Sequence, residues 1–254
     1  MTVSFGDSQA LGRIMTVEGL AGGSCPFNCV YCTVAHPPPT TRRRRVADAH
    51  AVGALLDVAR EKAGALDHLV IGGGGDPLLW TGIGDFLRRV HTRYAVPLAV
   101  LTPGPLLSRG AIRDAMEPVD VVMVKLDAGL HRLMQAVNRP HRGVRFDRLV
   151  ESLGRFAAAF DGALWAQTRP IPGVNDGIGE MTRLATALRG ISPAKVIVAG
   201  LVPGGWGTRS EKQRISLGEI QVLEIPDGTA SSGSAVMGAD GSAQKISFQG
   251  CWRI

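Results

Sequence analysis

Residues 96–127, VPLAVLTPGPLLSRGAIRDAMEPVDVVMVKLD, contain the pattern that decides the fold. A short apolar run at 96–102 predicts a buried strand, residues 106–116 have the spacing of a short helix, and 119–127 predicts a second buried strand. Two apolar strands joined by a helix are typical of parallel strands linked by a crossover. This stretch therefore predicts one β/α unit of a parallel sheet.

The same alternation continues on both sides of this unit. Further strands are predicted at 13–20, 68–72, 163–169 and 194–200, and further helices at 46–63, 82–94, 129–137, 145–160 and 177–189. About six β/α units favour a parallel sheet covered by helices, either doubly wound or curled into a barrel. In both folds the chemistry lies in the loops that follow the strands.

The sequence changes in character beyond about residue 205. The stretch GGWGTRSEKQ at 204–213 is typical of a loop or linker, and short strand-like runs follow at 219–225, 234–238 and 244–252. We therefore expect a core domain over residues 1–205 and a small β-rich C-terminal extension over 206–254.

Composition limits the class of protein. The 254 residues carry 28 Lys and Arg against 22 Asp and Glu, and the resulting net charge of +6 permits an anionic partner without identifying one. No run approaches the roughly 18 apolar residues that a membrane span needs. The first residues lack the order of a signal peptide. We expect a cytoplasmic protein, in which clustered cysteines are metal ligands or catalytic groups more often than disulfides.

Three of the four cysteines lie together in SCPFNCVYC at 24–32, and Cys251 is far away. Buried small hydrophobic thiols are one interpretation, and a zinc site that adds His36 is another. An iron–sulfur cubane normally takes four thiolates, so three would leave one iron open for another ligand. Cys251 lies in the predicted extension, which favours the open iron.

The spacing C-x3-C-x2-C, with Tyr31 before the last cysteine, resembles the cluster loop of the radical S-adenosylmethionine superfamily. The resemblance implies a [4Fe–4S] cluster on Cys25, Cys29 and Cys32, with S-adenosylmethionine chelating the open iron and Tyr31 near this cofactor. It also implies a partial (β/α)6 TIM-like barrel, whose mouth the C-terminal extension would cap.

A second motif is VIGGGGDPLL at 70–79. No G-x-G-x-x-G register fits it and no Gly-Lys-Ser/Thr follows, so neither a dinucleotide-binding turn nor a P-loop is predicted. It resembles the G-G-E-P motif of the same superfamily, which implies that Gly73, Gly74, Gly75 and Asp76 hold the methionine amino group. Asp76 stands where the longer Glu is commoner. A tight turn between strand and helix is compatible with the same glycines.

Later segments resemble the wybutosine-type tRNA-modifying subset of Fe–S oxidoreductases, namely VMVKLDAG at 122–129, AVNRPHRG at 136–143 and LWAQTRPIPGVND at 164–176. On this resemblance Thr102 and Gly104 lie near the adenosyl group, and Lys125 and Asp127 near its ribose or carboxylate. An ion pair between Lys125 and Asp127 is the alternative. For Arg139, one interpretation is a helix-capping or substrate-phosphate residue, and a surface arginine is an equal alternative.

The family resemblance implies a reaction. A donor such as flavodoxin or ferredoxin reduces the cluster, S-adenosylmethionine is cleaved to a 5′-deoxyadenosyl radical, and the radical abstracts hydrogen from a small-molecule or nucleotide substrate. One alternative is an activase that forms a glycyl radical on a partner protein, although activases usually show D-L-K where this chain has K-L-D. Another is a zinc-stabilised RNA-binding protein that uses Arg42 to Arg45. Those four arginines are also explained by a solvated edge, which leaves a nucleic-acid partner weakly supported.

Overall fold

The structure is a computed structural model. It describes residues 1–32, 34, 37–46, 52–54, 56–57, 61, 65–201, 221–226, 235–237 and 243–245. Most of the predicted helix 46–63 lies outside the described residues, and its described positions at 52–54, 56–57 and 61 are helical. His36, Cys251, the linker 204–213 and the 205/206 boundary also lie outside them.

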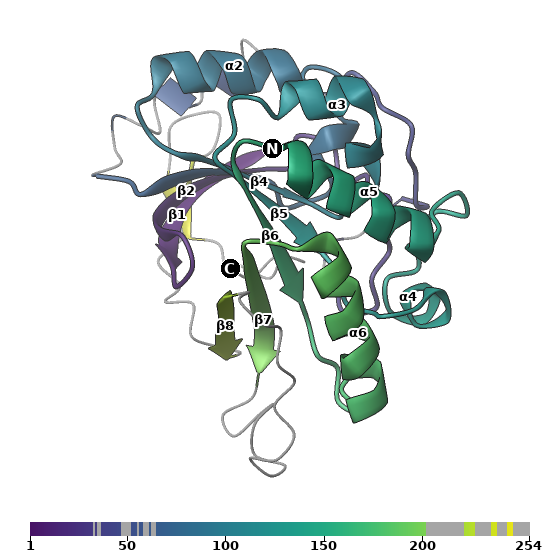
Figure 1. Ribbon diagram of the computed structural model, residues 1–254. Coiled ribbons are helices and arrows are strands. Elements are labelled where there is room, and N and C mark those ends of the chain that lie inside the picture. The colour runs from purple at the N-terminus through teal and green to yellow at the C-terminus, as the bar shows by residue number, and fades with distance from the viewer. Residues whose placement is uncertain are drawn as a thin grey trace.

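A curled sheet organises the described part of the chain (Figure 1). Its eight strands follow one another in sequence order, and all neighbours are parallel except the first pair. The strands are β1 (Thr2–Ser8), β2 (Gly12–Glu18), β3 (His68–Ile71), β4 (Leu98–Thr102), β5 (Val121–Lys125), β6 (Ala163–Thr168), β7 (Lys195–Leu201) and β8 (Gln221–Pro226). Because the order never reverses, the sheet is a partial barrel and not a doubly wound sheet. The predicted fold class is confirmed.

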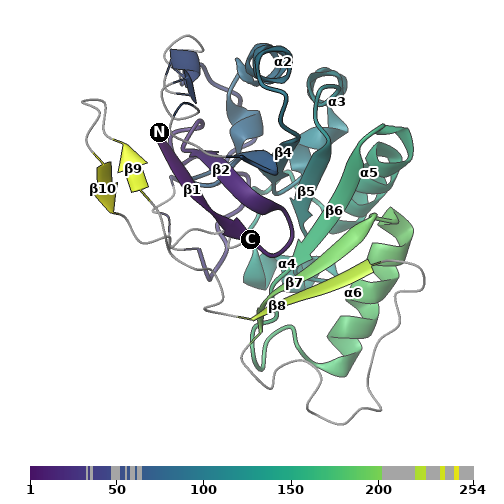
Figure 2. The ribbon, with the colours of Figure 1, turned by 90° about the vertical axis from the view of Figure 1, so that its left-hand side faces the viewer.

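Helices cover the convex face of this sheet, as Figure 2 shows. They are α2 (Ile83–Arg93), α3 (Gly110–Ala115), α4 (His131–Val137), α5 (Phe146–Ala159) and α6 (Ile178–Ile191), with short 3₁₀ helices η1 (Pro77–Leu79) and η2 (Pro105–Ser108) after β3 and β4. The predicted helix 106–116 is therefore divided into η2 and α3. The other predicted helices from 82 onward are confirmed to within two residues at each end.

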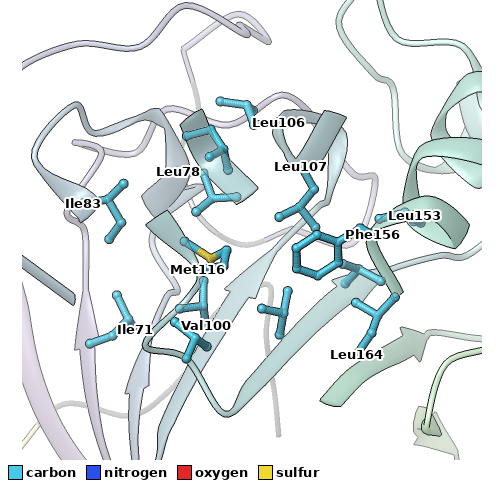
Figure 3. Close-up of a cluster of buried hydrophobic side chains, with 14 of the residues drawn as sticks. Ile71, Leu78, Ile83, Val100, Leu106, Leu107, Met116, Leu153, Phe156 and Leu164 are labelled. Atoms are coloured by element: carbon cyan, nitrogen blue, oxygen red, sulfur yellow. The ribbon is translucent and has the colours of Figure 1, made fainter. Parts of the chain in front are cut away.

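Both faces of the central strands are buried, which explains why they read as continuous apolar runs. On the convex face, side chains such as Val100, Leu107 and Phe156 pack between the sheet and the helices (Figure 3). On the concave face, alternate residues such as Leu101 and Met123 form a second apolar cluster. Burial on both faces keeps the sheet rigid, so that its carboxyl edge is a fixed platform for the loops that follow the strands.

The two ends of the sheet differ from the sequence prediction. The hairpin strand β1, which pairs antiparallel with β2, was not predicted. At the other end β8, from the predicted extension, pairs parallel with β7 and extends the main sheet. A separate hairpin of β9 (Ala235–Met237) and β10 (Ala243–Lys245) lies next to β1 (Figure 2). Among the described helices, none combines the length and the apolar character that a membrane crossing requires.

Candidate cluster and cofactor site

The cysteine loop begins at the carboxyl end of β2, where the predicted active edge of the sheet lies. Cys25 and Cys29 are half-buried free thiols that pack against the convex-face core. The Cys25 sulfur accepts a hydrogen bond from the Phe27 amide at 3.4 Å. The Cys32 amide donates to the Cys29 carbonyl at 3.0 Å, so the second and third cysteines share one tight turn.

The glycine motif packs directly against this loop. The Gly19 amide donates to the Gly73 carbonyl at 3.0 Å, and the Asp76 amide donates to the Ser24 carbonyl at 2.8 Å. Gly73, Gly74 and Gly75 have φ of 91°, 59° and 117°, in the region that favours glycine. A Cβ on Gly75 would lie 2.6 Å from the Ser24 carbonyl oxygen. The glycines are therefore required for the close contact between the two motifs.

Asp76 is fully buried, with 0% of its surface exposed. Its Oδ1 accepts from the Leu78 amide at 3.1 Å and caps η1, whereas Oδ2 has no hydrogen-bond partner among the described residues. Burial raises the pKa of Asp76 to about 7, although the Leu78 amide and the Thr102 hydroxyl favour the carboxylate. A buried carboxylate oxygen without a partner is costly, and it fits a cationic ligand.

A second polar group lies at the ends of β5 and β6, around Asp127, which is 1% exposed. Lys125 Nζ is 3.7 Å from Asp127 Oδ1 and 3.2 Å from Gln167 Oε1. The Tyr31 hydroxyl donates to Asp127 Oδ2. The Tyr31 ring faces Lys125 Nζ and the Arg169 guanidinium at 5.1 Å and 5.4 Å from its centroid. The structure thus brings together Tyr31, Lys125 and Asp127, and forms the alternative Lys125–Asp127 ion pair.

Burial sets the electrostatics of this group. It lowers the pKa of the Lys125 ammonium, while the nearby Asp127 carboxylate partly restores it. Burial also raises the pKa of the Tyr31 hydroxyl well above its ordinary value, and the Asp127 charge adds to the effect. The tyrosine is therefore a neutral hydrogen-bond donor to the carboxylate.

Three residues of this group were not predicted as site residues, although the stretches that contain them were noted. The Arg169 amide donates to Asp127 Oδ1 at 2.7 Å, and Asn138 Nδ2 donates to Asp127 Oδ2 at 2.6 Å. Asn175 Nδ2 donates to the Asp127 carbonyl at 2.8 Å. The available signal was polar residues directly after a strand or helix end, but the sequence did not show that all three converge on Asp127, two on its carboxylate and one on its main-chain carbonyl.

The segment after α4 also holds the cysteine loop. The Asn28 amide donates to the carbonyls of Asn138 and Arg139 at 2.9 and 3.2 Å. The Val30 amide donates to the Val137 carbonyl at 2.9 Å. Arg139 is exposed and has φ of 44°, a conformation that few non-glycine residues adopt. Its observed contribution to the site is therefore made through its backbone.

Thr102 is the last residue of β4, and Gly104 follows the strand. Thr102 is fully buried, and its hydroxyl accepts from the Gly104 amide at 3.1 Å. Gly104 has φ of 98°, and a Cβ there would point toward Leu153 and Val124, on the helix side of the sheet. Thr102 lies near Asp76, whose carboxylate its hydroxyl favours, whereas the conformation of Gly104 is explained by the turn into η2.

The arginine run lies along η1 and the residues that follow it. Arg43 donates to the carbonyls of Leu78 and Trp80 at 3.1 and 2.9 Å, so its guanidinium supports the turn that holds Asp76. Arg44 pairs through its backbone with the same segment. Arg42, Arg44 and Arg45 are exposed. The three exposed arginines agree with the solvated-edge interpretation, whereas Arg43 is half-buried and has a structural role.

The three cysteine sulfurs of the loop are the kind of donor that an iron–sulfur cluster requires. Burial raises the pKa of the Cys25 thiol, with a further contribution from Asp76, and burial likewise raises the pKa of the Cys29 thiol. The thiols of such cysteines become thiolates on binding a metal cation. Cys32 does not carry a free thiol in the structure, and within the described residues no trio of His, Cys, Asp or Glu is arranged to hold a metal. The cluster therefore requires Cys32 in its reduced form. Three soft sulfur ligands beside an unpartnered carboxylate oxygen fit the cluster and its cofactor in chemistry.

Curated relatives match most of this chain but less of their own length. Over 202 residues it is 24% identical to a UPF0026 protein of Methanocaldococcus jannaschii, covering 77% of this chain and 62% of that protein. Over 192 residues it is 23% identical to a protein named GTPase Obg of Brachyspira hyodysenteriae, covering 74% of this chain and 28% of that protein. The chain thus spans less than two thirds of the length of these relatives. Neither bears a wybutosine-type name, and the finer subset suggested by the later motifs is not supported.

Among solved structures, a radical SAM methyltransferase from Sphaerobacter thermophilus has the same fold, with a TM-score of 0.64 and 21% identity. The match covers 85% of this chain and 67% of that one. The model of the radical SAM superfamily matches residues 21–185, which include the cysteine loop, the glycine motif and strands β3 to β6. The family implies a [4Fe–4S] cluster and S-adenosylmethionine, and the motif of Cys25, Cys29 and Cys32 fits. The chain belongs to the radical SAM superfamily of enzymes.

Proposed function

We propose that this chain cleaves S-adenosylmethionine reductively at a [4Fe–4S] cluster and abstracts hydrogen from a small-molecule or nucleotide substrate. Cys25, Cys29 and Cys32 would hold three irons and leave the fourth open for the cofactor. The proposal goes beyond family membership, because it assigns the ligands, the cofactor contacts and the reaction to this chain.

The buried Oδ2 of Asp76 is the observation that carries the proposal. The Asp76 amide donates a hydrogen bond to the carbonyl of Ser24, the residue before Cys25. A carboxylate with one oxygen kept dry and without a partner binds an ammonium group strongly, because the ligand replaces the lost hydration of that oxygen. The amino group of S-adenosylmethionine supplies such a cation beside the open iron. Asp76 therefore stands in the role of the commoner glutamate.

The remaining site residues would orient the cofactor and exclude water. Gly73, Gly74 and Gly75 bring the backbone close to the cysteine loop, so backbone groups can approach a ligand there without side chains in the way. Thr102 and Gly104 would contact the adenosyl group. On the other side, Tyr31, Lys125 and Asp127 would face its ribose or carboxylate.

When bound, the cluster and S-adenosylmethionine supply a 5′-deoxyadenosyl radical after one-electron reduction. Enzymes of this superfamily generally need an electron donor, for which flavodoxin or ferredoxin is the proposed class here. The chain's own residues hold the reacting groups in place and keep solvent from them. We further propose that residues 206–254 contribute to substrate access, because β8 from that segment forms an edge of the barrel.

The test is anaerobic reconstitution of the full chain, followed by iron and sulfide analysis and electron paramagnetic resonance of the dithionite-reduced protein. We expect four irons per chain and a signal that changes when S-adenosylmethionine is added. Slow formation of 5′-deoxyadenosine should depend on both the cofactor and the reductant. A protein that binds zinc and no iron after reconstitution would refute the proposal.

Two variants test cofactor binding and cluster binding separately. Asp76→Asn should retain the four irons but lose the spectral change on adding S-adenosylmethionine, because the amide carries no charge for the ammonium. Cys29→Ser should lose the cluster itself. If Asp76→Asn bound the cofactor as tightly as the parent chain, the assigned role of Asp76 would be wrong. Deuterium transfer from a labelled candidate substrate into 5′-deoxyadenosine would identify the substrate class.

A further inference from the structure

We propose that Asn138 is a positioning residue that sets the reduction potential of the cluster, by donating a side-chain N–H to the sulfur of Cys29. Asn138 Nδ2 lies 3.4 Å from Cys29 Sγ, within the range of an N–H···S hydrogen bond. The inference rests on the proposed function, since it concerns the sulfur that would bind an iron. It adds a residue outside both the cysteine and the glycine motifs.

The backbone fixes this contact on both sides of Cys29. Asn28, directly before the cysteine, donates its amide to the carbonyls of Asn138 and Arg139, and Val30, directly after it, donates to the Val137 carbonyl. The His141 amide completes the contact by donating to the Pro26 carbonyl at 2.8 Å. Four main-chain hydrogen bonds thus hold residues 26–30 against 137–141. The distance between Asn138 and Cys29 is therefore set by the backbone and does not depend on a metal.

Asp127 determines which end of the Asn138 side chain faces the sulfur. Asn138 Nδ2 donates to Asp127 Oδ2 at 2.6 Å. An ionised carboxylate only accepts hydrogen bonds, so the NH₂ group and not the carbonyl oxygen of the amide must face it. The second hydrogen of the same NH₂ group is available to Cys29. Asp127 is itself held by the Tyr31 hydroxyl and the Arg169 amide, so the amide cannot flip without losing this acceptor.

Burial makes this contact effective. Asn138 is 2% exposed, so water does not compete for its N–H group or screen its dipole. Reduction adds negative charge that is shared between the irons and their thiolates. A donor at the thiolate stabilises the reduced form more than the oxidised form, which raises the potential. Asn138 therefore makes the cluster easier to reduce.

The experiment compares midpoint potentials of the reconstituted full chain, measured without S-adenosylmethionine by redox titration followed by electron paramagnetic resonance. Asn138→Leu removes the donor at similar volume, and Asn138→Ser shortens it beyond reach of the sulfur. We expect both midpoints to become more negative by roughly 20 to 60 mV, equivalent to a two- to tenfold weaker one-electron reduction. Exchangeable-proton hyperfine couplings, compared in H₂O and D₂O, should lose one component in both variants.

Asn175→Leu is the matched control. Asn175 is equally buried and also donates to Asp127, but to its main-chain carbonyl, and it has no hydrogen bond to a cysteine sulfur among those described. Its midpoint should remain that of the parent chain.

The midpoints and iron contents of these variants test the role of Asn138 separately from the proposed function. Unchanged midpoints in both Asn138 variants, or an equal shift in Asn175→Leu, would overturn the inference and leave the proposed function intact. Loss of iron from both Asn138 variants, with iron retained by the control, would overturn it in favour of a purely structural role. A parent chain that holds no four-iron cluster would overturn the proposed function, and this inference with it.

Discussion

Asp76→Asn is the most informative single change, because it alters both the stability of the apo-protein and cofactor binding. Burial raises the pKa of Asp76 from its ordinary value of 3.8 to about 7, so the folded chain prefers the protonated acid. A raised pKa contributes stability that is fully present below pH 3.8 and is lost as the pH rises to about 7. The difference of about 3 pH units, at 1.36 kcal/mol each, amounts to about 4 kcal/mol.

Asparagine does not titrate, so the variant should not lose this stability. We expect the free energy of unfolding of the parent chain to fall by about 4 kcal/mol more than that of the variant between pH 4 and pH 8. With a urea dependence of about 2 kcal/mol per molar, the two denaturation midpoints should move by about 2 M relative to each other. Equilibrium urea denaturation of the reduced, iron-free protein at several pH values provides the measurement.

The difference between the two chains is decisive, because groups common to both cancel. Asp161→Asn, at an exposed position, is the control and should follow the parent chain within about 0.5 kcal/mol at every pH. Parallel curves for the parent chain and Asp76→Asn would show that the Asp76 carboxyl is hydrated or paired in solution. In that case Oδ2 would already be satisfied and would not need a cationic ligand.

Three further predictions follow from the site. Gly75→Ala places a side chain at a positive φ against the cysteine loop and should lower the free energy of unfolding, measured by denaturation, by about 1–3 kcal/mol. Gly6→Ala, which has open space around it, is the control and should lower the free energy of unfolding by less than about 1 kcal/mol. Arg43→Ala removes hydrogen bonds to the turn that holds Asp76 and should lower the free energy of unfolding by about 1–2 kcal/mol. Arg45→Ala, at an exposed position, should lower it by less than about 0.5 kcal/mol. Equal effects of the two arginines would contradict a structural role for Arg43. Cys25→Ala should abolish reconstitution of four irons, and retention of the full iron content would remove this residue from the ligand set.

The contacts around the cysteine loop suggest why the site is assembled as it is. One side of the loop is bonded to the glycine motif through Ser24, and the other to residues 137–141 through Asn28 and Val30. Two independent parts of the barrel therefore fix one nine-residue segment. Such support from neighbouring elements is what holds the ligands of a metal site in a fixed geometry.

Local patterns predicted the elements that depend on local interactions. Apolar runs and helical spacing located the strands and helices from residue 68 to 201, because each element buries a face that the sequence periodicity records. The cysteine spacing and the glycine run were equally readable, because each motif lies within ten residues of chain. The hairpin strand β1 was missed, since its sequence, TVSFGDS, is only partly apolar and its pairing with β2 is what stabilises it.

The sequence by itself determined the alternating β/α layout, the three-cysteine loop and the glycine turn, because short-range spacing specifies all three. The alternation by itself left open the barrel and the doubly wound sheet, the family resemblance of the motifs implied the barrel, and the unreversed strand order of the tertiary structure confirmed it. The tertiary structure alone joined Tyr31 to Asp127 and Cys29 to Asn138, across separations of 96 and 109 residues. The physical reason is that parallel strands bring their carboxyl ends to one edge, where polar groups distant in sequence become hydrogen-bond partners.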